Sequence, residues 1–361
     1  MSDFRRIAIV GIGAIGGSFG LALKQVSYGA HIVGVDAAES LAQAKELGAI
    51  DEACPSLPEG ISGADLIVLT GSTEEVEGLL SQVTAELPRG VIVSDFTPLK
   101  LKISNRVRSD EKRQFGYVGI HPLRRPLEKG IEEAFPDFFY GIPIFLTPAQ
   151  RKDMEAFEKV KALFETLGAR PVGMTPEAHD QFLAEIQQLP HLMTTAYLRL
   201  LFAKELAERP SRETLEEVLL APMRSLVELP SDWPDEADAN RENIAVALRS
   251  FAKHLESLAA EFAKGNAGVE LEAAKDRALQ VLSDQGFRAP IPGIRVSLPK
   301  GKESLSQIAE VLAKSNILVR EVNQSESEKS RSVRIIFDSQ SDAELAAKRL
   351  KGVGFRVWKL I

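Results

Sequence analysis

The sequence predicts a chain of three parts. The first is an α/β domain with a doubly wound, mainly parallel sheet, the second is all-α, and the third is a small module of β-α-β-β-α-β order. Short apolar runs alternate with helical patterns over residues 6–174, as in a parallel sheet covered by helices on both faces. Long helical patterns occupy residues 177–283, and residues 294–361 return to short strands and helices.

The most informative stretch runs from Arg6 to Asp36. It opens with a continuous apolar run, typical of a strand buried on both faces, and continues as G-x-G-x-x-G at Gly11, Gly13 and Gly16. Gly11 permits a tight turn and Gly13 lets the backbone approach a pyrophosphate, while Gly16 lets the next helix lie close to the sheet. The pattern predicts a phosphate-binding turn at a helix N-terminus.

A second apolar run, His31 to Val35, ends in Asp36, about 20 residues after the glycines. An acid there accepts hydrogen bonds from both ribose hydroxyls of an adenosine and repels a 2′-phosphate. We therefore predict a Rossmann domain that binds NAD in preference to NADP; the alternative is a glycine-rich turn in another kind of α/β unit. The predicted cofactor-binding residues are Gly11, Ile12, Gly13, Ala14, Ile15, Gly16, Asp36, Thr70, Gly71, Ser72 and Asp95.

Helices and strands alternate after Asp36. The predicted helices are 40–47, 73–87, 100–108 and 148–167, and the predicted strands are 65–69, 91–94, 117–120, 141–146 and 170–174. Ligands of such a sheet bind at the carboxyl ends of its strands, where Thr70, Asp95 and His121 fall. His121, followed by Pro122, is expected on a loop at this edge.

The sequence pattern changes after Pro176, from alternating strands and helices to long helices. Helices are predicted at 177–208, 213–220, 239–262 and 268–283. Helices this long and apolar usually bury part of their surface against a second copy, so we expect a homodimer.

Residues 289–293 form a Pro/Gly linker. The ferredoxin-like module that follows has predicted strands 294–298, 317–322, 332–338 and 355–360, and predicted helices 305–315 and 343–350. The predicted domains are 1–174, 175–288 and 293–361.

Composition limits the function classes. A net charge of −7 over 361 residues, without a dense Lys/Arg cluster, argues against a nucleic-acid partner. Cys54 is the single cysteine, so neither a disulfide framework nor a cysteine metal site is expected. The chain enters its first strand within a few residues, which leaves no room for a signal peptide, and no apolar run approaches the ~20 residues of a membrane span. We expect a cytoplasmic protein without a bound metal.

A nicotinamide site usually needs an acid or base near the reacting carbon. Of the five histidines, His31 in a strand and His254 on a charged helix are expected to be structural or solvated. His121 is the candidate general base, because it falls at the ligand edge of the sheet. The alternative is an ordinary turn histidine.

Several segments match one family. They are VGIGAIGGSFGLALK at 10–24, GVD at 34–36, SDFTPLK at 94–100, GYVGIHPL at 116–123, IPIFLTP at 142–148 and AHDQFLAEIQQLPH at 178–191, with Arg224, Trp233 and Asn240 at the family's spacing. On these segments the chain resembles the prephenate dehydrogenases of the TyrA family, in the bacterial form with a C-terminal ACT domain. The resemblance extends over nearly the whole chain.

The resemblance implies NAD-dependent oxidative decarboxylation of prephenate to 4-hydroxyphenylpyruvate, in tyrosine biosynthesis. It makes His121 the general base, with Lys100 and Thr97 as further catalytic residues, and Arg224 the guanidinium that binds a substrate carboxylate. Without the resemblance, the sequence around Arg224 indicates a surface salt-bridge residue. The ACT-like module implies tyrosine as an effector; the alternative is a dimer-stabilising module, and the turn at 299–302 departs from the family's P-G turn.

Three motifs depart from the family pattern. Pro98 replaces the serine of D-x-G-S-x-K, which leaves Thr97 as the nearby hydroxyl, and Gln188 replaces the first histidine of S-H-L-P-H. Arg124 and Arg125 replace small residues, where they can bind a carboxylate or face solvent. The predicted substrate-binding residues are Arg224, Gln188, His191, Arg124 and Arg125.

These departures keep other functions open. The substrate can be arogenate in place of prephenate, or the chain can be a non-catalytic NAD-dependent sensor with an altered pocket. A β-hydroxyacid dehydrogenase is not favoured, because its catalytic lysine belongs on the helical domain and residues 177–200 contain no lysine.

Overall fold

The computed structural model describes residues 4–84, 87–123, 130–203, 229, 233–284, 293–298, 304–315, 317–327, 330–337 and 339–359. The chain divides into two compact units, Met1–Ala252 and Lys253–Ile361, which are described separately. The predicted helical domain, 175–288, spans this division. The helix predicted at 213–220 lies outside the described residues.

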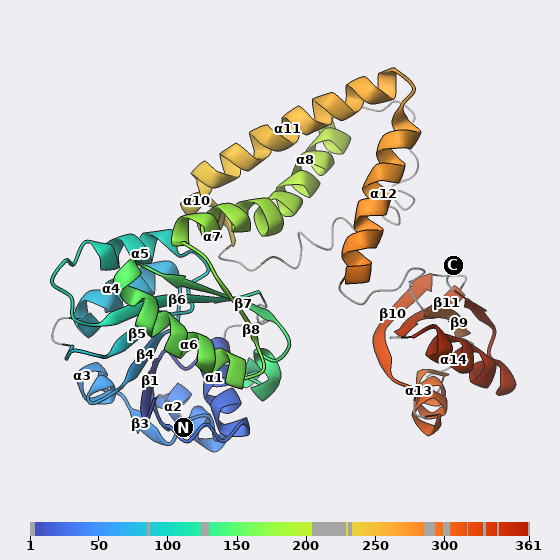
Figure 1. Ribbon diagram of the computed structural model, residues 1–361. Helices are drawn as coiled ribbons and strands as arrows, with labels where there is room; N and C mark the ends of the chain where they lie inside the picture. The colour runs from blue at the N-terminus through green and yellow to red at the C-terminus, as the bar shows by residue number, and fades with distance from the viewer. Residues whose placement is uncertain are drawn as a thin grey trace. The chain divides into compact units, whose positions relative to one another are not determined.

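The first unit is built on a mixed sheet with the strand order β3-β2-β1-β4-β5-β6-β7-β8 (Figure 1). The strands are β1 (Arg6–Val10), β2 (His31–Val35), β3 (Glu52–Cys54), β4 (Leu66–Leu69), β5 (Ile92–Asp95), β6 (Gly116–Pro122), β7 (Pro143–Pro148) and β8 (Arg170–Gly173). Neighbouring strands are parallel except β6 and β7. With β1 between β2 and β4, this is the predicted doubly wound order.

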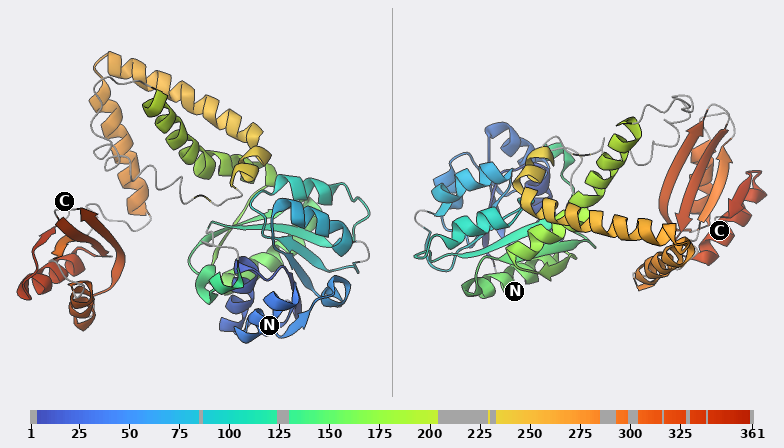
Figure 2. Two further views of the ribbon diagram at one scale, coloured as in Figure 1. Left: turned by 180° about the vertical axis from the view of Figure 1, so that it is seen from behind. Right: turned by 90° about the horizontal axis from the view of Figure 1, so that it is seen from above.

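Helices cover both faces of this sheet, as the two opposite views show (Figures 1 and 2). They are α1 (Ala14–Gln25), α2 (Ala38–Glu46), α3 (Leu57–Ile61), α4 (Thr73–Thr84), α5 (Leu101–Arg108) and α6 (Met154–Thr166). Alternate side chains of β1 enter different cores: Ile7 and Ile9 pack with α1, α2 and α6, and Ala8 and Val10 pack with α4 and α5. Every residue of β4 and β5 is buried. β4 is a continuous apolar run, whereas β5 ends in the buried polar residues Ser94 and Asp95.

Three details differ from the sequence prediction. β3 and α3 were not predicted, because three and five residues are too short to show a period. His121 and Pro122 lie at the end of β6 rather than on a loop, since the antiparallel pairing with β7 sets His121 opposite Phe145. The helix predicted from Pro148 begins at Met154, after a 3₁₀ turn over Arg151–Asp153, and Pro148 itself ends β7.

The helical segment of the first unit begins with α7 (Pro176–Leu183) and continues through one π-helical turn, Ala184–Gln188, into α8 (Leu189–Ala203). The predicted single helix therefore contains a π turn, a feature that often marks functional sites. The helices α10 (Trp233–Ala239) and α11 (Arg241–Ala263) follow, and a small core joins the π turn to α11 through Ala184, Ile244 and Ala247.

The second unit contains α12 (Ala267–Asp284) and a small α/β module. This module runs β9 (Gly293–Leu298), α13 (Ser304–Lys314), β10 (Val319–Ser327), β11 (Ser330–Phe337), α14 (Gln340–Gly352) and β12 (Val357–Lys359). Its antiparallel sheet has the order β10-β11-β9-β12, and both helices contribute to one apolar core. The predicted β-α-β-β-α-β order is observed. In neither unit does a described helix have the length and apolar character that a membrane span requires.

A buried ion pair joins the segment before β6 to the start of α6. The Arg113 guanidinium donates to both carboxylate oxygens of Asp153, at 2.7 and 2.6 Å, and both side chains are fully shielded from solvent. Asp153 also accepts from the backbone N–H groups of Tyr117 and Gln150, at 3.0 and 2.9 Å. Removing one partner would leave the other charge buried and unpaired. The free-energy cost of this exceeds the net stabilisation that the ion pair provides.

We expect Asp153→Ala to lower the free energy of unfolding by about 3–5 kcal/mol, because the Arg113 charge loses its buried partner. The matched control is Glu155→Ala, which removes the exposed Glu155–Lys159 pair on the same helix and should cost only about 0.3–0.5 kcal/mol. Urea unfolding followed by circular dichroism measures both variants. Equal midpoints for the two would show that the Arg113–Asp153 pair contributes no more than a surface pair.

Candidate active site

The strand register brings the predicted site residues to one edge of the sheet. Val10 pairs with Leu69, Leu69 with Asp95, and Asp95 with Gly119, so these four residues form one row across β1, β4, β5 and β6. The chain leaves this row at Gly11, Thr70, Phe96 and Ile120. The glycine turn, the β4–α4 turn, the β5–α5 turn and His121 therefore share the carboxyl edge.

The glycine turn is tightly built. Gly11 has φ +94°, and a Cβ placed there would lie 2.3 Å from Oγ1 of Thr70. The Thr70 hydroxyl donates to the Gly11 carbonyl oxygen at 2.6 Å. A Cβ on Gly16 would lie 2.1 Å from that same carbonyl oxygen, so only glycine lets α1 approach the turn this closely.

The N-terminus of α1 is suited to a dinucleotide. Gly13 is its N-cap residue, and no side chain caps the helix, so the first-turn N–H groups around Ala14 and Ile15 and the positive end of the dipole face the turn. Beside them lies Asp36, whose Oδ2 accepts from the Ile12 N–H at 2.6 Å. A cradle that excludes side chains, an uncapped helix end and a carboxylate at the ribose position together fit NAD.

The other predicted cofactor residues support this edge in different ways. Ser72 and Glu75 form a capping box at the start of α4: the Glu75 N–H donates to the Ser72 hydroxyl oxygen at 3.2 Å, and the Ser72 N–H donates to the Glu75 carboxylate at 2.7 Å. Gly71 has φ +139° and makes the turn before it. Thr70, through its bond to Gly11, is the member that contacts the glycine turn.

Asp95 is the centre of a fully buried network. Its Oδ1 accepts from the Lys100 ammonium at 2.8 Å, from the Thr97 N–H at 2.9 Å and from the Thr97 hydroxyl; its Oδ2 accepts from the Tyr117 hydroxyl at 2.5 Å. Burial raises the pKa of Tyr117 well above its usual value of 10, so its hydroxyl stays a donor. Burial lowers the pKa of Lys100 from 10.5, and Asp95 opposes that shift.

This network bears on three predicted roles. The side chains of Asp95, Thr97 and Lys100 have no exposed surface. Their polar atoms bond to one another inside the β5–α5 turn and hold that turn in place. Their predicted roles toward cofactor and substrate stay predictions.

His121 is joined to α7 by a chain of hydrogen bonds. Its Nδ1 lies 2.9 Å from Nε2 of His179, and Nδ1 of His179 lies 2.8 Å from Oδ1 of Asp180. Asp180 in turn accepts from the backbone N–H groups of Lys100 and Leu101, at 2.8 and 2.9 Å. This series of hydrogen bonds thus joins the end of β6, through α7, to the N-terminus of α5.

Gln188 lies in the π turn and is fully buried. Its Oε1 accepts from Nδ2 of Asn240 at 2.7 Å, and its Nε2 donates to Glu236 at 3.3 Å. Both functional atoms of the side chain are thus engaged within the protein, and the substrate contact predicted for Gln188 stays a prediction. His191 lies at the start of α8, with its ring edge-to-face to Trp233 at 5.9 Å. Arg124, Arg125 and Arg224 lie outside the described residues.

Sequence reasoning assigned no role to His179, Asp180, Asn240 or Tyr117, although all four fall at positions that match the family. A signal was present for the first pair. His179 and Asp180 share the buried side of α7 with Leu183, where an apolar residue is the ordinary choice. Adjacent ionisable residues on a buried helix face indicate polar partners within the protein.

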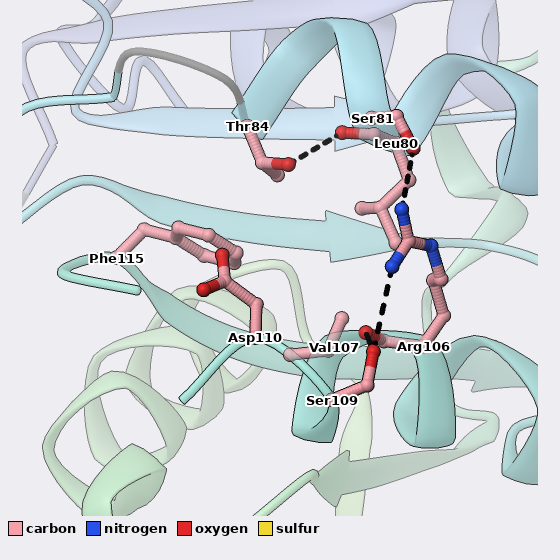
Figure 3. A pocket seen from close by; sticks show the side chains of 8 residues that line it. All are labelled: Leu80, Ser81, Thr84, Arg106, Val107, Ser109, Asp110 and Phe115. Carbon is pink, nitrogen blue, oxygen red and sulfur yellow. Dashed lines mark hydrogen bonds between the residues drawn. The ribbon is translucent and has the colours of Figure 1, made fainter. Parts of the chain in front are cut away.

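A cavity of about 310 Å³ lies elsewhere, between the C-terminal ends of α4 and α5 (Figure 3). Arg106 crosses it, donating to the hydroxyls of Ser81 and Ser109 at 2.9 and 3.4 Å. These helix ends adjoin the amino ends of the strands, opposite the edge where such sheets bind ligands, and none of the predicted site residues lines the cavity. The described residues contain no group of three or more His, Cys, Asp or Glu side chains arranged to hold a metal.

Comparison with known proteins agrees with this geometry. Residues 19–172 match the family model described as the nucleotide-binding domain of prephenate dehydrogenase. The chain is 28% identical over 192 residues to a prephenate dehydrogenase of Bacillus subtilis, covering 53% of this chain and 52% of the relative. It is 24% identical over 281 residues to a cyclohexadienyl dehydrogenase of Zymomonas mobilis, covering 76% and 94%. The chain thus spans about half the length of the Bacillus relative.

A solved structure is also similar. The prephenate dehydrogenase of A. aeolicus, crystallised with hydroxyphenyl propionate and NAD⁺, superposes with a TM-score of 0.65 and 25% identity, covering 77% of this chain and 98% of that one. The doubly wound sheet, the glycine turn with Asp36 and these matches define an NAD-binding Rossmann domain. Over residues 19–172 this domain is similar to the nucleotide-binding domain of prephenate dehydrogenases.

We expect the unmodified enzyme to have a higher kcat/KM with NAD than with NADP, because Asp36 lies beside the glycine turn. Asp36→Ser should lower the kcat/KM for NAD roughly 10- to 100-fold, the worth of hydrogen bonds to a charged group, and reduce the discrimination against NADP. Steady-state kinetics with both cofactors measure this. Glu39→Ser, an exposed acid on α2, is the control and should change neither value. Preference of the unmodified enzyme for NADP would contradict the role of Asp36.

Proposed function

We propose that this protein catalyses the NAD-dependent oxidative decarboxylation of prephenate to 4-hydroxyphenylpyruvate, a step in tyrosine biosynthesis. The observation that carries the proposal is the position of His121. It is a buried histidine at the carboxyl edge of the sheet, beside the β5–α5 turn and on the same edge as the glycine turn. A base is needed there, since prephenate gives up a hydroxyl proton and a hydride together.

The proposed reaction uses the chain's residues as follows. His121 accepts the proton of the substrate's C4 hydroxyl, and the electron pair of that O–H bond forms the product's C=O, which becomes the phenol. NAD⁺ held at the glycine turn would supply the acceptor for the hydride that leaves C4. The ring carboxylate leaves as CO₂, and the electrons of its bond to the ring complete the aromatic system. Arg224 is proposed to bind a substrate carboxylate, on the ground of its sequence spacing, with Arg124 and Arg125 as further candidates.

The internal network supports a division of roles among these residues. Because Lys100 and Thr97 bond to Asp95, we propose that they act by fixing the turn beside His121. Arogenate differs from prephenate only in its side chain, where an amino group replaces the keto group. It is the alternative substrate, and kinetics with both compounds discriminate them. A chain that bound NAD but turned over neither compound would be the non-catalytic homologue.

We expect His121→Ala to lower kcat by roughly 10²–10⁴, the usual worth of a general base, with little change in NAD affinity. The matched control is His31→Ala, which removes a half-exposed histidine on β2 bonded to Glu52. NADH absorbance with prephenate and with arogenate reports the rate, and fluorescence titration reports NAD binding. A near-normal kcat in the His121 variant would place the base elsewhere.

We further propose a homodimer and an ACT-type regulatory role for the C-terminal module. Leu255, Leu258 and Phe262 form an exposed apolar row along α11, which supports burial against a second copy. The β-α-β-β-α-β module has its own apolar core, which supports a separable regulatory domain. A cytoplasmic location, where Cys54 stays reduced, completes the proposal.

If the module binds tyrosine, we expect tyrosine to inhibit the intact chain and not a chain truncated after Pro290. An effector acts only through differential affinity for two states, so tyrosine must also change substrate binding. Inhibition kinetics on both chains, with a circular dichroism spectrum of the truncated one as a folding control, measure this. Equal inhibition would place tyrosine at the active site, and no inhibition would make the module structural.

A further inference from the structure

We propose that His179 and Asp180 are a positioning pair that holds His121 as the tautomer with its proton on Nδ1 and its lone pair on Nε2. The inference rests on the proposed function, in which His121 takes the substrate's proton. Neither residue needs to touch the substrate. Their effect would pass through one hydrogen bond, the contact of 2.9 Å between Nδ1 of His121 and Nε2 of His179.

The pair is anchored from its far end. The two oxygens of Asp180 accept from two backbone N–H groups at the start of α5, those of Lys100 and Leu101. Both carboxylate oxygens are thus engaged as acceptors, at the end of α5 where the helix dipole is positive. The helix that carries the pair, α7, is itself capped, because Thr175 Oγ1 accepts from the Ala178 N–H at 3.2 Å. Asp180 is therefore a fixed acceptor.

Because Asp180 can only accept, it determines the direction of each hydrogen bond that links Asp180, His179 and His121. An ionised carboxylate has no proton to donate, so Nδ1 of His179, 2.8 Å from Asp180 Oδ1, must carry the hydrogen. In a neutral imidazole this makes Nε2 of His179 an acceptor. The hydrogen of the next bond therefore lies on Nδ1 of His121, and the lone pair of His121 lies on Nε2.

The surroundings hold the two rings in place. The rings of His121 and His179 meet edge-to-face with centroids 5.0 Å apart. Phe145 on β7 lies 5.5 Å from His179 and 6.5 Å from His121, and Phe182 on α7 packs against Phe145 at 5.4 Å. His179 has no exposed surface and His121 only 4%. In so dry a site each hydrogen bond is stronger than in water, and the orientation is correspondingly well defined.

Among the residues that the structure describes, the charged and titratable groups named here near the pair come from three elements. Asp180 belongs to α7 itself. Lys100 and Asp95 come from the β5–α5 turn, where they are ion-paired at 2.8 Å, and Tyr117 from β6 donates to Asp95. The Lys100–Asp95 pair is nearly neutral as a unit. The negative charge of Asp180 is thus the local charge that stabilises an imidazolium formed when His121 accepts a proton.

The decisive variants are His179→Leu, His179→Gln and Asp180→Asn. Leucine removes the acceptor and should lower kcat by roughly 10²–10³, while the NAD affinity stays unchanged. Glutamine restores a carbonyl acceptor for the Nδ1–H of His121 and should recover most of the lost rate. Asparagine can donate to His179 and so reverse the chain of hydrogen bonds. It should lower kcat by up to about 10⁴, the drop seen when the carboxylate that orients a triad histidine becomes an amide.

Two readouts separate positioning from a merely structural role. In His179→Leu the imidazolium of His121 loses its acceptor, so the acidic limb of the kcat/KM profile should move to lower pH. In ¹⁵N NMR of the unmodified full-length protein, Nε2 of His121 should resonate as an unprotonated nitrogen and Nδ1 as a protonated one, with His121→Ala supplying the assignment. The control is Glu177→Gln, an exposed position on the same helix, which should change neither readout.

The outcomes are distinct. An Nε2–H tautomer of His121 in the unmodified protein, or a His179→Leu variant with kcat and pH profile unchanged, would overturn the positioning role. The NMR measurement needs no turnover, so it tests the pair even if a variant fails to fold. Absence of turnover with both prephenate and arogenate would instead overturn the proposed function, and the tautomer would still decide whether the pair orients His121.

Discussion

The carboxylate of Asp180 is the contact on which the site depends. It accepts hydrogen bonds from two backbone N–H groups of the β5–α5 turn and from His179, so one side chain joins the helical segment to the Rossmann sheet and orients the ring next to His121. The β5–α5 turn is held from its other side by the buried Asp95 network. Because both anchors are buried and fully bonded, the base, the turn and α7 form one rigid group.

This arrangement shows what surrounds two of the residues that depart from the family pattern, Pro98 and Gln188. Pro98 replaces a serine within the β5–α5 turn, and the remaining hydroxyl, that of Thr97, bonds to Asp95 and the Leu99 carbonyl oxygen. The turn thus keeps its geometry through internal bonds. Gln188 replaces a histidine, and its amide joins Asn240 and Glu236 across the π turn. The amide of Gln188 thus supports the π turn, and Pro98 leaves Thr97 as the hydroxyl of the β5–α5 turn.

The parts of the site that were predictable are those made by neighbours in sequence. The glycine turn, α1 and Asp36 belong to one β-α-β unit, so their spacing alone indicates the dinucleotide site. His121 was placed at the right edge by strand alternation, but whether it ended a strand or began a loop depended on pairing with β7. The partners of Lys100 and Thr97 were hidden, because a motif identifies a residue type and does not show which way its side chain turns.

The sequence by itself determined the doubly wound sheet, the order of the C-terminal module and the cofactor class, because hydrophobic period and glycine spacing act over short stretches of chain. Only the tertiary structure decided that His121 meets His179, 58 residues away, and that Gln188 meets Asn240, 52 residues away. Such contacts arise when helices pack on a sheet, and packing is governed by the whole apolar surface rather than by the residues that it brings together. The positioning of the base is therefore a property of the fold.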